Sequence, residues 1–136
     1  MSYGMAAVLQ SAVYQHLLAD PVLSGLVGSN IFDAAPAGGV PSLYVSLGDE
    51  DVKDASDNFG RGATHEFTVS VITDVSGFLA AKEVAAAISD ALHEAPLVLS
   101  RGRLVLLRFQ RAKARRVETG TKRRIDLRFR ARLEDD

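Results

Sequence analysis

The chain has 136 residues, the length of a single domain, which is enough to bury about two thirds of the surface that the unfolded chain exposes. It contains no cysteine, and this excludes disulfide bonds, thiolate metal sites and cysteine nucleophiles. The formal net charge of −1 is the balance of two unequal parts. Residues 1–100 carry 3 Lys and Arg against 12 Asp and Glu, a charge of −9, whereas residues 101–136 carry 13 against 5, a charge of +8.

The first part of the chain predicts one long helix, a short helical turn and a strand. In residues 4–19, apolar side chains recur at spacings of three and four, and a proline then ends the helix. Residues 22–27 add one short turn. Proline and glycine punctuate residues 36–41, after which a weak alternation of apolar and polar side chains predicts a strand over residues 42–48.

Residues 49–62, DEDVKDASDNFGRG, are polar, acidic and rich in small side chains, which predicts a long exposed loop. The segment lacks the central glycine and the final bidentate glutamate that a calcium loop requires. We therefore expect a docking loop that becomes ordered on contact with a partner. Its acidic residues are Asp49, Glu50, Asp51, Asp54 and Asp57.

The second part predicts a strand, a helix and a long hairpin. Residues 65–73 alternate cleanly and predict a strand, and residues 76–93 form an alanine-rich helix with one apolar stripe. Residues 103–117 and 121–133 predict two long strands joined by a short connection that contains glycine. Together with the first part, these elements predict an α+β fold: an antiparallel sheet of about four strands, with two main helices packed on it and a long C-terminal β-hairpin.

A two-residue loop at Thr119-Gly120 fixes the register that we expect for this hairpin. In that register the apolar faces of the two strands coincide, and a slip of one residue would reverse them. The other face gains one ion pair and one cation–π contact. The expected facing pairs are Ile125 with Ala114, Leu127 with Ala112, Leu133 with Leu106, Asp126 with Lys113, Arg128 with Arg111 and Arg130 with Phe109.

Cations occupy one face of the predicted hairpin: Arg111, Lys113, Arg115, Lys122, Arg124, Arg128, Arg130 and Arg132. Side chains two positions apart on a strand are separated by about 6.6 Å, inside the Debye length of about 8 Å at physiological salt, so these cations repel one another. Three interpretations are open: a solvated face that prevents aggregation, a nucleic-acid-binding face, or a face that docks on acidic surface of another subunit or partner. The pI of 6.3 and the few aromatic residues argue against sequence-specific recognition.

Catalytic and cofactor motifs are missing from the sequence. The three histidines lie far apart with no neighbour at metal-ligand spacing, and the sequence contains no nucleophile elbow, phosphate loop or dinucleotide fingerprint. We therefore expect neither an enzyme nor a bound metal or cofactor. No apolar run approaches the roughly 20 residues that span a bilayer, and the first residues lack a basic leader, so we expect a soluble, cytoplasmic chain without a membrane partner.

Two stretches resemble a known family. LLADPVLSGLVGSNIFDAAPAGGVPSLYVSLGDE is similar to the opening of the tail-completion, or tail-terminator, proteins of long-tailed phages and gene transfer agents. HEFTVSVITDVSGFLAAKEVAAAISDALHEAPLVL resembles the next block of the same family, and the likeness covers about residues 16–98 together with the general shape of the closing hairpin. Where many relatives have a tryptophan near the end of the central strand, this chain has Val71-Ile72.

The resemblance implies that residues 1–136 form one tail-terminator-like domain with helices packed on an antiparallel sheet. Such proteins form a homo-oligomeric ring, usually a hexamer, that caps the head-proximal end of the tail tube, stops its polymerisation and joins the head connector. The implied partners are other copies of the chain, the tail tube protein, the connector protein and DNA passing through the lumen. The implied location is the head-tail junction of a phage-like particle, with the host cytoplasm during assembly. The alternative function is a sequence-independent nucleic-acid-binding module that uses the basic hairpin.

Overall fold

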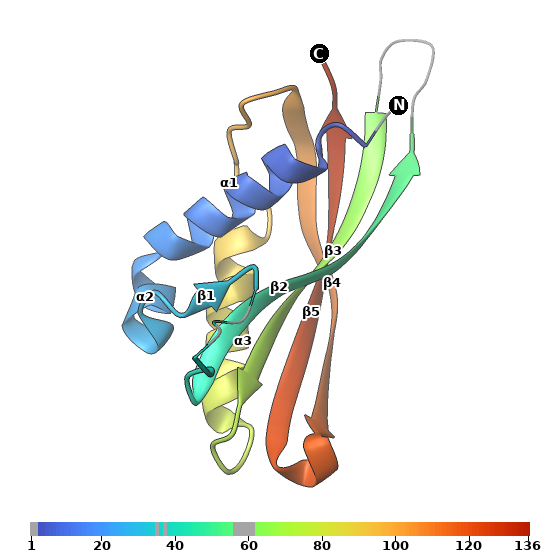
Figure 1. Ribbon diagram of the computed structural model, residues 1–136. Helices are drawn as coiled ribbons and strands as arrows, with labels where there is room; N and C mark the ends of the chain where they lie inside the picture. The colour runs from blue at the N-terminus through green and yellow to red at the C-terminus, as the bar shows by residue number, and fades with distance from the viewer. Residues whose placement is uncertain (1–2, 35, 37, 56–61) are drawn as a thin grey trace.

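The computed structural model of the chain describes residues 3–34, 36, 38–55 and 62–136. Within this part of the chain, three α-helices pack against a five-stranded sheet (Figure 1). The helices are α1 (Ala6–Ala19), α2 (Pro21–Val27) and α3 (Leu79–Leu92). The strands are β1 (Ile31–Phe32), β2 (Leu43–Asp54), β3 (Gly62–Thr73), β4 (Arg103–Val117) and β5 (Lys122–Glu134), and the short turn η1 (Glu118–Gly120) joins the last two.

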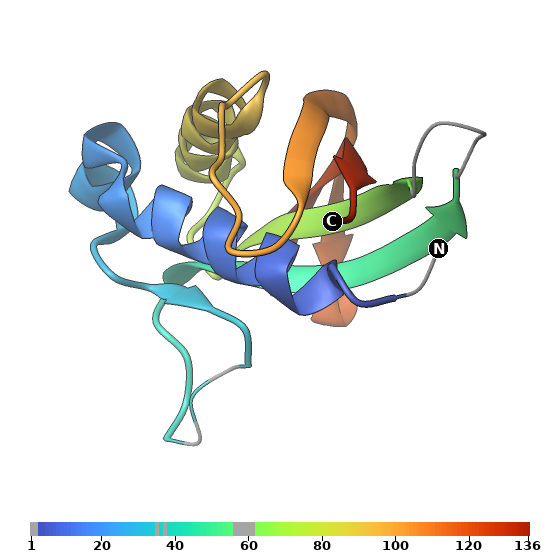
Figure 2. The ribbon, with the colours of Figure 1, turned by 90° about the horizontal axis from the view of Figure 1, so that it is seen from above.

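The sheet has the strand order β1-β2-β3-β5-β4, so the long strand β4 forms one edge. The two-residue strand β1 runs parallel to β2, and the other neighbouring strands of the described sheet run antiparallel. Figure 2 shows α1 and α3 on the same side of this sheet. The predicted α+β fold with helices on a mainly antiparallel sheet is therefore confirmed; the short helical turn predicted over residues 22–27 is α2, and β1 is a small addition.

The first two helices form because apolar side chains and a capping residue occur at the required positions. Leu9, Val13 and Leu17 lie one turn apart on α1 and are almost completely buried, which fixes the side of the helix that faces the sheet. The side chain of Asp20 accepts a hydrogen bond of 2.9 Å from the backbone N–H of Leu23 and so caps α2, which begins at a proline. The aspartate–proline step therefore ends one helix and starts the next.

The core lies between the helices and the covered face of the sheet. Helix α3 buries small side chains such as Ala81 and Ala85, and these let it approach the strands closely. Phe129 on β5 is fully buried, with its ring centroid 5.6 Å from that of Phe67 and 5.8 Å from that of Phe109. This aromatic cluster joins β3, β5 and β4 across the sheet.

The prediction of a loop over residues 49–62 is wrong for the described part of that segment. Strand β2 continues to Asp54 and pairs with β3 as far as Ala63. A bulge between Leu47 and Glu50 shifts the register, so the alternation seen in residues 42–48 does not continue in phase. Residues 49–54 therefore have the composition of a loop, although their backbone pairs as a strand. Residues 56–61 lie outside the described residues.

The predicted hairpin register is correct only near the turn. Ala114 faces Ile125 and Lys113 faces Asp126, as expected, but a bulge between Phe109 and Arg111 shifts the next pairs by one residue, and a second irregularity between Leu104 and Leu106 shifts the last pairs by one more. Two expected contacts are consequently wrong, because Arg130 faces Arg108 rather than Phe109, and Leu133 faces Leu104 rather than Leu106. Alternation alone cannot locate a bulge, since the pattern on each side of it still has a period of two.

Candidate functional site

Figure 1 shows the helices on one side of the sheet. Most of the hairpin's positive charge lies on the other side. On β5 the alternate residues Ile125, Leu127 and Phe129 are buried on the helix side, so the residues between them point to the opposite side. Directly facing residues of neighbouring strands share a side of the sheet. The cations of β4 that face these outward residues of β5 therefore lie on the same side as them. We call this surface the basic face. Arg103 at its far end faces Glu134 and forms an ion pair with it. The cations that define the basic face are Arg108, Arg111, Lys113, Arg115, Lys122, Arg124, Arg128, Arg130 and Arg132.

All eight cations expected from the sequence lie on the basic face, and the structure adds a ninth. Without the bulge in β4, Arg108 would face Ala131 on the helix side, whereas in the structure it faces Arg130. The alternation of β4, counted from the turn, puts Arg108 on the helix side, so this position could not be found from the sequence. The bulge thus extends the basic face toward the beginning of β4.

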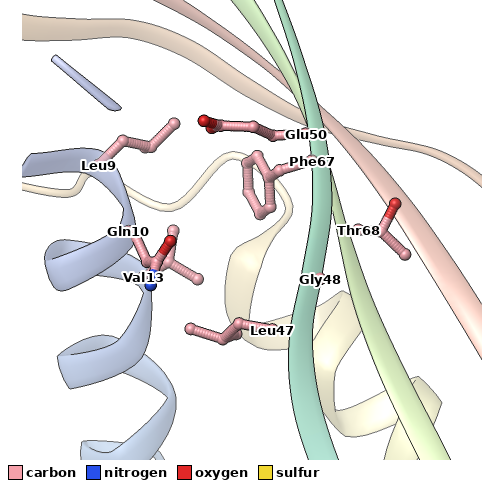
Figure 3. Close-up of a pocket in the computed structure, with 8 residues that line it drawn as sticks. All are labelled: Leu9, Gln10, Val13, Leu47, Gly48, Glu50, Phe67 and Thr68. Carbon is pink, nitrogen blue, oxygen red and sulfur yellow. The ribbon is translucent and has the colours of Figure 1, made fainter. Parts of the chain in front are cut away.

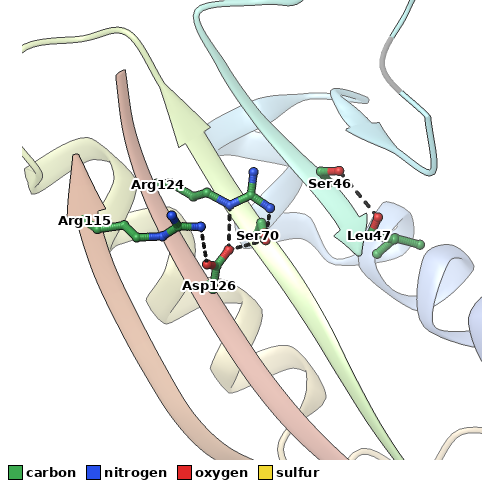
Figure 4. Close-up of polar contacts among 6 residues, drawn as sticks. All are labelled: Ser46, Leu47, Ser70, Arg115, Arg124 and Asp126. Carbon is green, nitrogen blue, oxygen red and sulfur yellow. Dashed lines mark hydrogen bonds and ion pairs between the residues drawn. The ribbon is translucent and has the colours of Figure 1, made fainter. Parts of the chain in front are cut away.

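One carboxylate at the centre of the basic face organises several of these cations. Asp126 Oδ1 accepts hydrogen bonds from Ser70 Oγ at 2.6 Å and from Arg124 Nε at 2.8 Å (Figure 4). Its Oδ2 atom lies 3.3 Å from Arg115 Nη2. Burial alone would raise the pKa of Asp126, but the hydrogen bonds from Ser70 and Arg124 and the positive charges outweigh it and lower the pKa below its ordinary value. Asp126 therefore stays ionised and holds Arg115 and Arg124 in place.

A second carboxylate partly neutralises the basic face on its β3 side. Glu66 Oε2 lies 3.7 Å from Arg128 Nε, at an ordinary surface ion-pair distance. Asp49 of β2 and Thr68 of β3 line a polar hollow together with cations of β4 and β5. The hollow therefore has one carboxylate, Asp49, on its β2 side, and five cations together with Asp126 on its β4 and β5 side.

The residues expected to form one acidic docking loop are spread over both faces of β2. Asp51 is exposed and faces Glu66 on the same side of the sheet as the basic face. Glu50 points to the helix side, where its carboxylate accepts a hydrogen bond from the Tyr3 hydroxyl. Asp54 is exposed at the end of the strand, opposite Ala63, and Asp57 lies outside the described residues.

Glu50 lies at the wall of a small, mainly apolar pocket between α1 and the sheet (Figure 3). Behind it, His65 is fully buried, with its Nδ1 atom 3.9 Å from Glu50 Oε2 and neither ring nitrogen hydrogen-bonded within the described residues. Burial raises the pKa of Glu50 and lowers the pKa of His65, so both tend toward their neutral forms. The other lining residues are Leu9, Gln10, Val13, Leu47, Gly48, Phe67 and Thr68, a set without a nucleophile and base in contact.

Two kinds of site are absent from the described residues. They contain no group of three or more His, Asp or Glu side chains arranged to hold a metal ion. None of the helices in this part of the chain has the length and apolar character needed to cross a membrane.

Comparison with known proteins identifies the family. The family model described as "Tail completion protein gp17" matches residues 11–134, which is most of the chain. The chain belongs to this tail completion family. Membership confirms the resemblance seen in the sequence and, with it, the expected class of structural tail protein.

A solved structure gives the same result for the fold. A chain of the "Virion of native gene transfer agent (GTA) particle" is 63% identical to this tail completion chain and superimposes with a TM-score of 0.93. The match covers 98% of this chain and 99% of that one. Both comparisons agree with the expected location in a phage-like particle. Comparison with curated proteins gives no match.

Proposed function

We propose that this chain forms a homo-oligomeric ring, taken as a hexamer, that caps the head-proximal end of a tail tube. There the ring stops tube polymerisation and joins the tail to the head connector. The observation that carries this proposal is the 63% identity, over nearly the full length of both chains, to a chain of a native gene transfer agent particle. Membership of the tail completion family supports the same role.

The edge strand β4 provides a surface for contact between copies. The N–H of Glu94 donates to the Leu107 carbonyl, and Phe109 donates its N–H to His93 Nδ1, so the segment after α3 covers this part of the edge. Beside it lies a hollow formed by residues 94–96 and 104–107, where Val105 and Leu106 are 45% and 38% exposed. We place the contact with the neighbouring copy at this hollow, because burial of its apolar side chains would stabilise a ring.

The acidic end of β2 is the element that we assign to docking on the tube or the connector. Asp51 is exposed and faces Glu66, a like charge, across the strand pair. Changing Asp51 to Lys therefore removes a repulsion and preserves the fold, while reversing the charge offered to a partner. We expect Asp51→Lys to cap tubes less well at unchanged thermal stability; unchanged capping would exclude Asp51 from the docking surface.

The proposed role is tested by adding gold-labelled protein to purified tail tubes and imaging them by negative-stain electron microscopy. We expect label at a single end of each tube, and tubes that no longer elongate at that end. Label that is scattered along the tubes or absent would contradict the proposal.

A matched pair of variants tests the ring contact in the same assay. Val105→Asp with Leu106→Asp places charge in the hollow beside β4 and is expected to prevent both ring formation and capping, as measured by light scattering and microscopy. The control is Val22→Asp on α2, where the side chain is 64% exposed and lies outside that hollow. If the double variant forms rings of normal size, the contact between copies does not lie at this hollow.

A further inference from the structure

The basic face contains cations that the protein itself leaves without a counter-charge. Asp126 engages Arg115 and Arg124, and Glu66 engages Arg128. Among the described residues, no ion pair is formed by the other cations that define this face apart from Lys122, which lies 3.8 Å from Glu118. The cations left unpaired are Arg108, Arg111, Lys113, Arg130 and Arg132.

Strand pairing fixes the backbone positions of these cations. They project from two paired strands, and Arg108 faces Arg130 while Arg111 faces Arg128 across the hairpin. Like charges that face each other directly on paired strands destabilise a sheet, so the fold carries this charge at a cost. A polyanion that lies along the face removes the repulsion.

We infer that the basic face binds the phosphate backbone of double-stranded DNA without reading its sequence. Its place in the lumen of a ring rests on the function proposed above, whereas the affinity for DNA follows from the face alone. The partner is identified by charge, by geometry and by what the face lacks.

Geometry favours a duplex laid along the hairpin. Ten residues separate Lys122 from Arg132, which at about 3.3 Å per residue is about 33 Å, close to one helical turn of about 34 Å in B-DNA. Except at Asp126 on β5 and at the bulge after Phe109 on β4, cations repeat about every 6.6 Å along each strand and lie about 4.8 Å apart between strands, so several phosphates meet a cation at once. The face belongs to a five-stranded sheet in which β3 pairs along β5, so it is broader than the single helix or two-stranded ribbon that the major groove admits, and its contacts are limited to the backbone.

The same surface is poorly suited to a stable protein interface. The buried centre of such interfaces is depleted of charged side chains and rich in aromatic and apolar ones. The aromatic residues Phe109 and Phe129 of the hairpin both belong to the cluster on the helix side. The lack of aromatic side chains on the hairpin's part of the basic face also disfavours single-stranded nucleic acid, whose bases stack on aromatic rings.

The test measures fluorescence anisotropy of two labelled 30-bp duplexes of unrelated sequence, titrated with the full-length chain between 50 and 200 mM salt. The disrupting variant is Arg111→Glu with Arg130→Glu. The matched control is Arg116→Glu with Lys82→Glu, which changes the charge equally but acts away from the basic face, since Arg116 faces Arg123 on the helix side of the hairpin and Lys82 lies on α3.

We expect equal affinity for both duplexes and a steep salt dependence for the wild-type chain and the control. The disrupting variant should bind at least about tenfold more weakly, and its log–log salt slope should be shallower by about 2, because two phosphate contacts are lost. No binding by the wild type at 50 mM salt, a preference for one sequence, or an equal loss in the control would overturn the inference.

The tube-capping assay on the same variants separates this inference from the proposed function. Loss of DNA binding with normal capping supports both assignments. Normal DNA binding with lost capping in the Arg111/Arg130 variant would show that the face contacts an acidic protein surface and would overturn the inference. A wild-type chain that binds DNA but leaves tubes uncapped would contradict the proposed function and the lumen location, while the DNA-binding assignment would stand.

Discussion

The two faces of strand β5 differ completely although they share one backbone. On the helix side Phe129 and Ala131 are fully buried, whereas between them Arg130 is exposed on the basic face. Burial of apolar surface makes the first face a source of stability, while the second adds electrostatic repulsion. Alternate residues of the same strand therefore have different roles: the buried ones stabilise the fold and the exposed ones are available to a partner. Substitutions can change one role without the other.

The largest effect is expected for Phe129→Ala. The ring is fully buried and contacts both Phe67 and Phe109, so its removal leaves a cavity where three strands meet. Unfolding in urea should show a loss of about 3–5 kcal/mol. The adjacent Arg130→Ala is the control and should change stability by less than about 0.5 kcal/mol. Similar losses for both variants would contradict the division between the two faces.

A smaller effect is expected for Asp126→Asn, because this carboxylate holds two of the cations of the basic face. Loss of the charge-assisted hydrogen bonds to Arg124 and Arg115 should cost about 1–3 kcal/mol at pH 7. Because the pKa of Asp126 is lowered in the folded chain, this contribution is present above about pH 4 and is lost as the pH falls through the lowered pKa.

Urea titrations of the wild type and of Asp126→Asn at pH 7 and at pH 3 check this expectation. The difference between the two proteins should shrink in acid. Asp90→Asn on the exposed side of α3 serves as the control and should show no such change. A difference that is constant with pH would mean that the carboxylate's charge has no role.

The helix side contains a titrating group of its own, His65. Burial lowers its pKa, so the unfolded chain takes up a proton below pH 6.5 more readily than the folded chain, and folding stability falls as the pH decreases from 7 to 5. The raised pKa of Glu50 acts in the opposite sense at lower pH. His65→Leu should make folding stability depend less on pH between pH 7 and pH 5, as measured by thermal unfolding. If the pH dependence is unchanged, it arises from other groups.

The smallest effect is expected for the stability of Arg111→Glu with Arg130→Glu. Neither residue forms an ion pair among the described residues, and both are exposed. Reversing their charges relieves the repulsion with Arg108 and Arg128, but Arg130→Glu also places a carboxylate opposite Glu66. These opposing effects should leave the free energy of unfolding within about 0.5 kcal/mol of the wild type. A loss above about 1 kcal/mol, measured in urea, would show that the basic face also stabilises the subunit.

Much of the fold was predictable because most elements follow a simple period. The alternation in residues 121–133 and the apolar stripe of α3 correspond to burial residue by residue, so the covered and uncovered faces of β5 could be assigned directly. All eight expected cations lie on one face for the same reason. Local period and side-chain chemistry are sufficient wherever an element is regular.

The remaining features depend on contacts between distant segments. The part of β2 near Asp51 has the composition of a loop, and only its pairing with β3 makes it a strand. Arg108 was missed because a bulge lies between it and the turn from which the register was counted. The short strand β1 forms by pairing with β2, and two residues are too few to show a period.

The bulge between Phe109 and Arg111 has a consequence for how the sequence of β4 can vary. It acts as a phase shift: Leu107 and Phe109 point to the core on one side of it, and Ala112 and Ala114 share their face on the other. Loss of the intervening Gln110 would remove the bulge and leave one continuous alternation, with Phe109 and Ala112 still facing the core and Arg108 and Arg111 still on the basic face. The sheet therefore tolerates deletion of Gln110, and paired changes of length near the turn likewise leave both faces intact and allow the charged end of the hairpin to diverge.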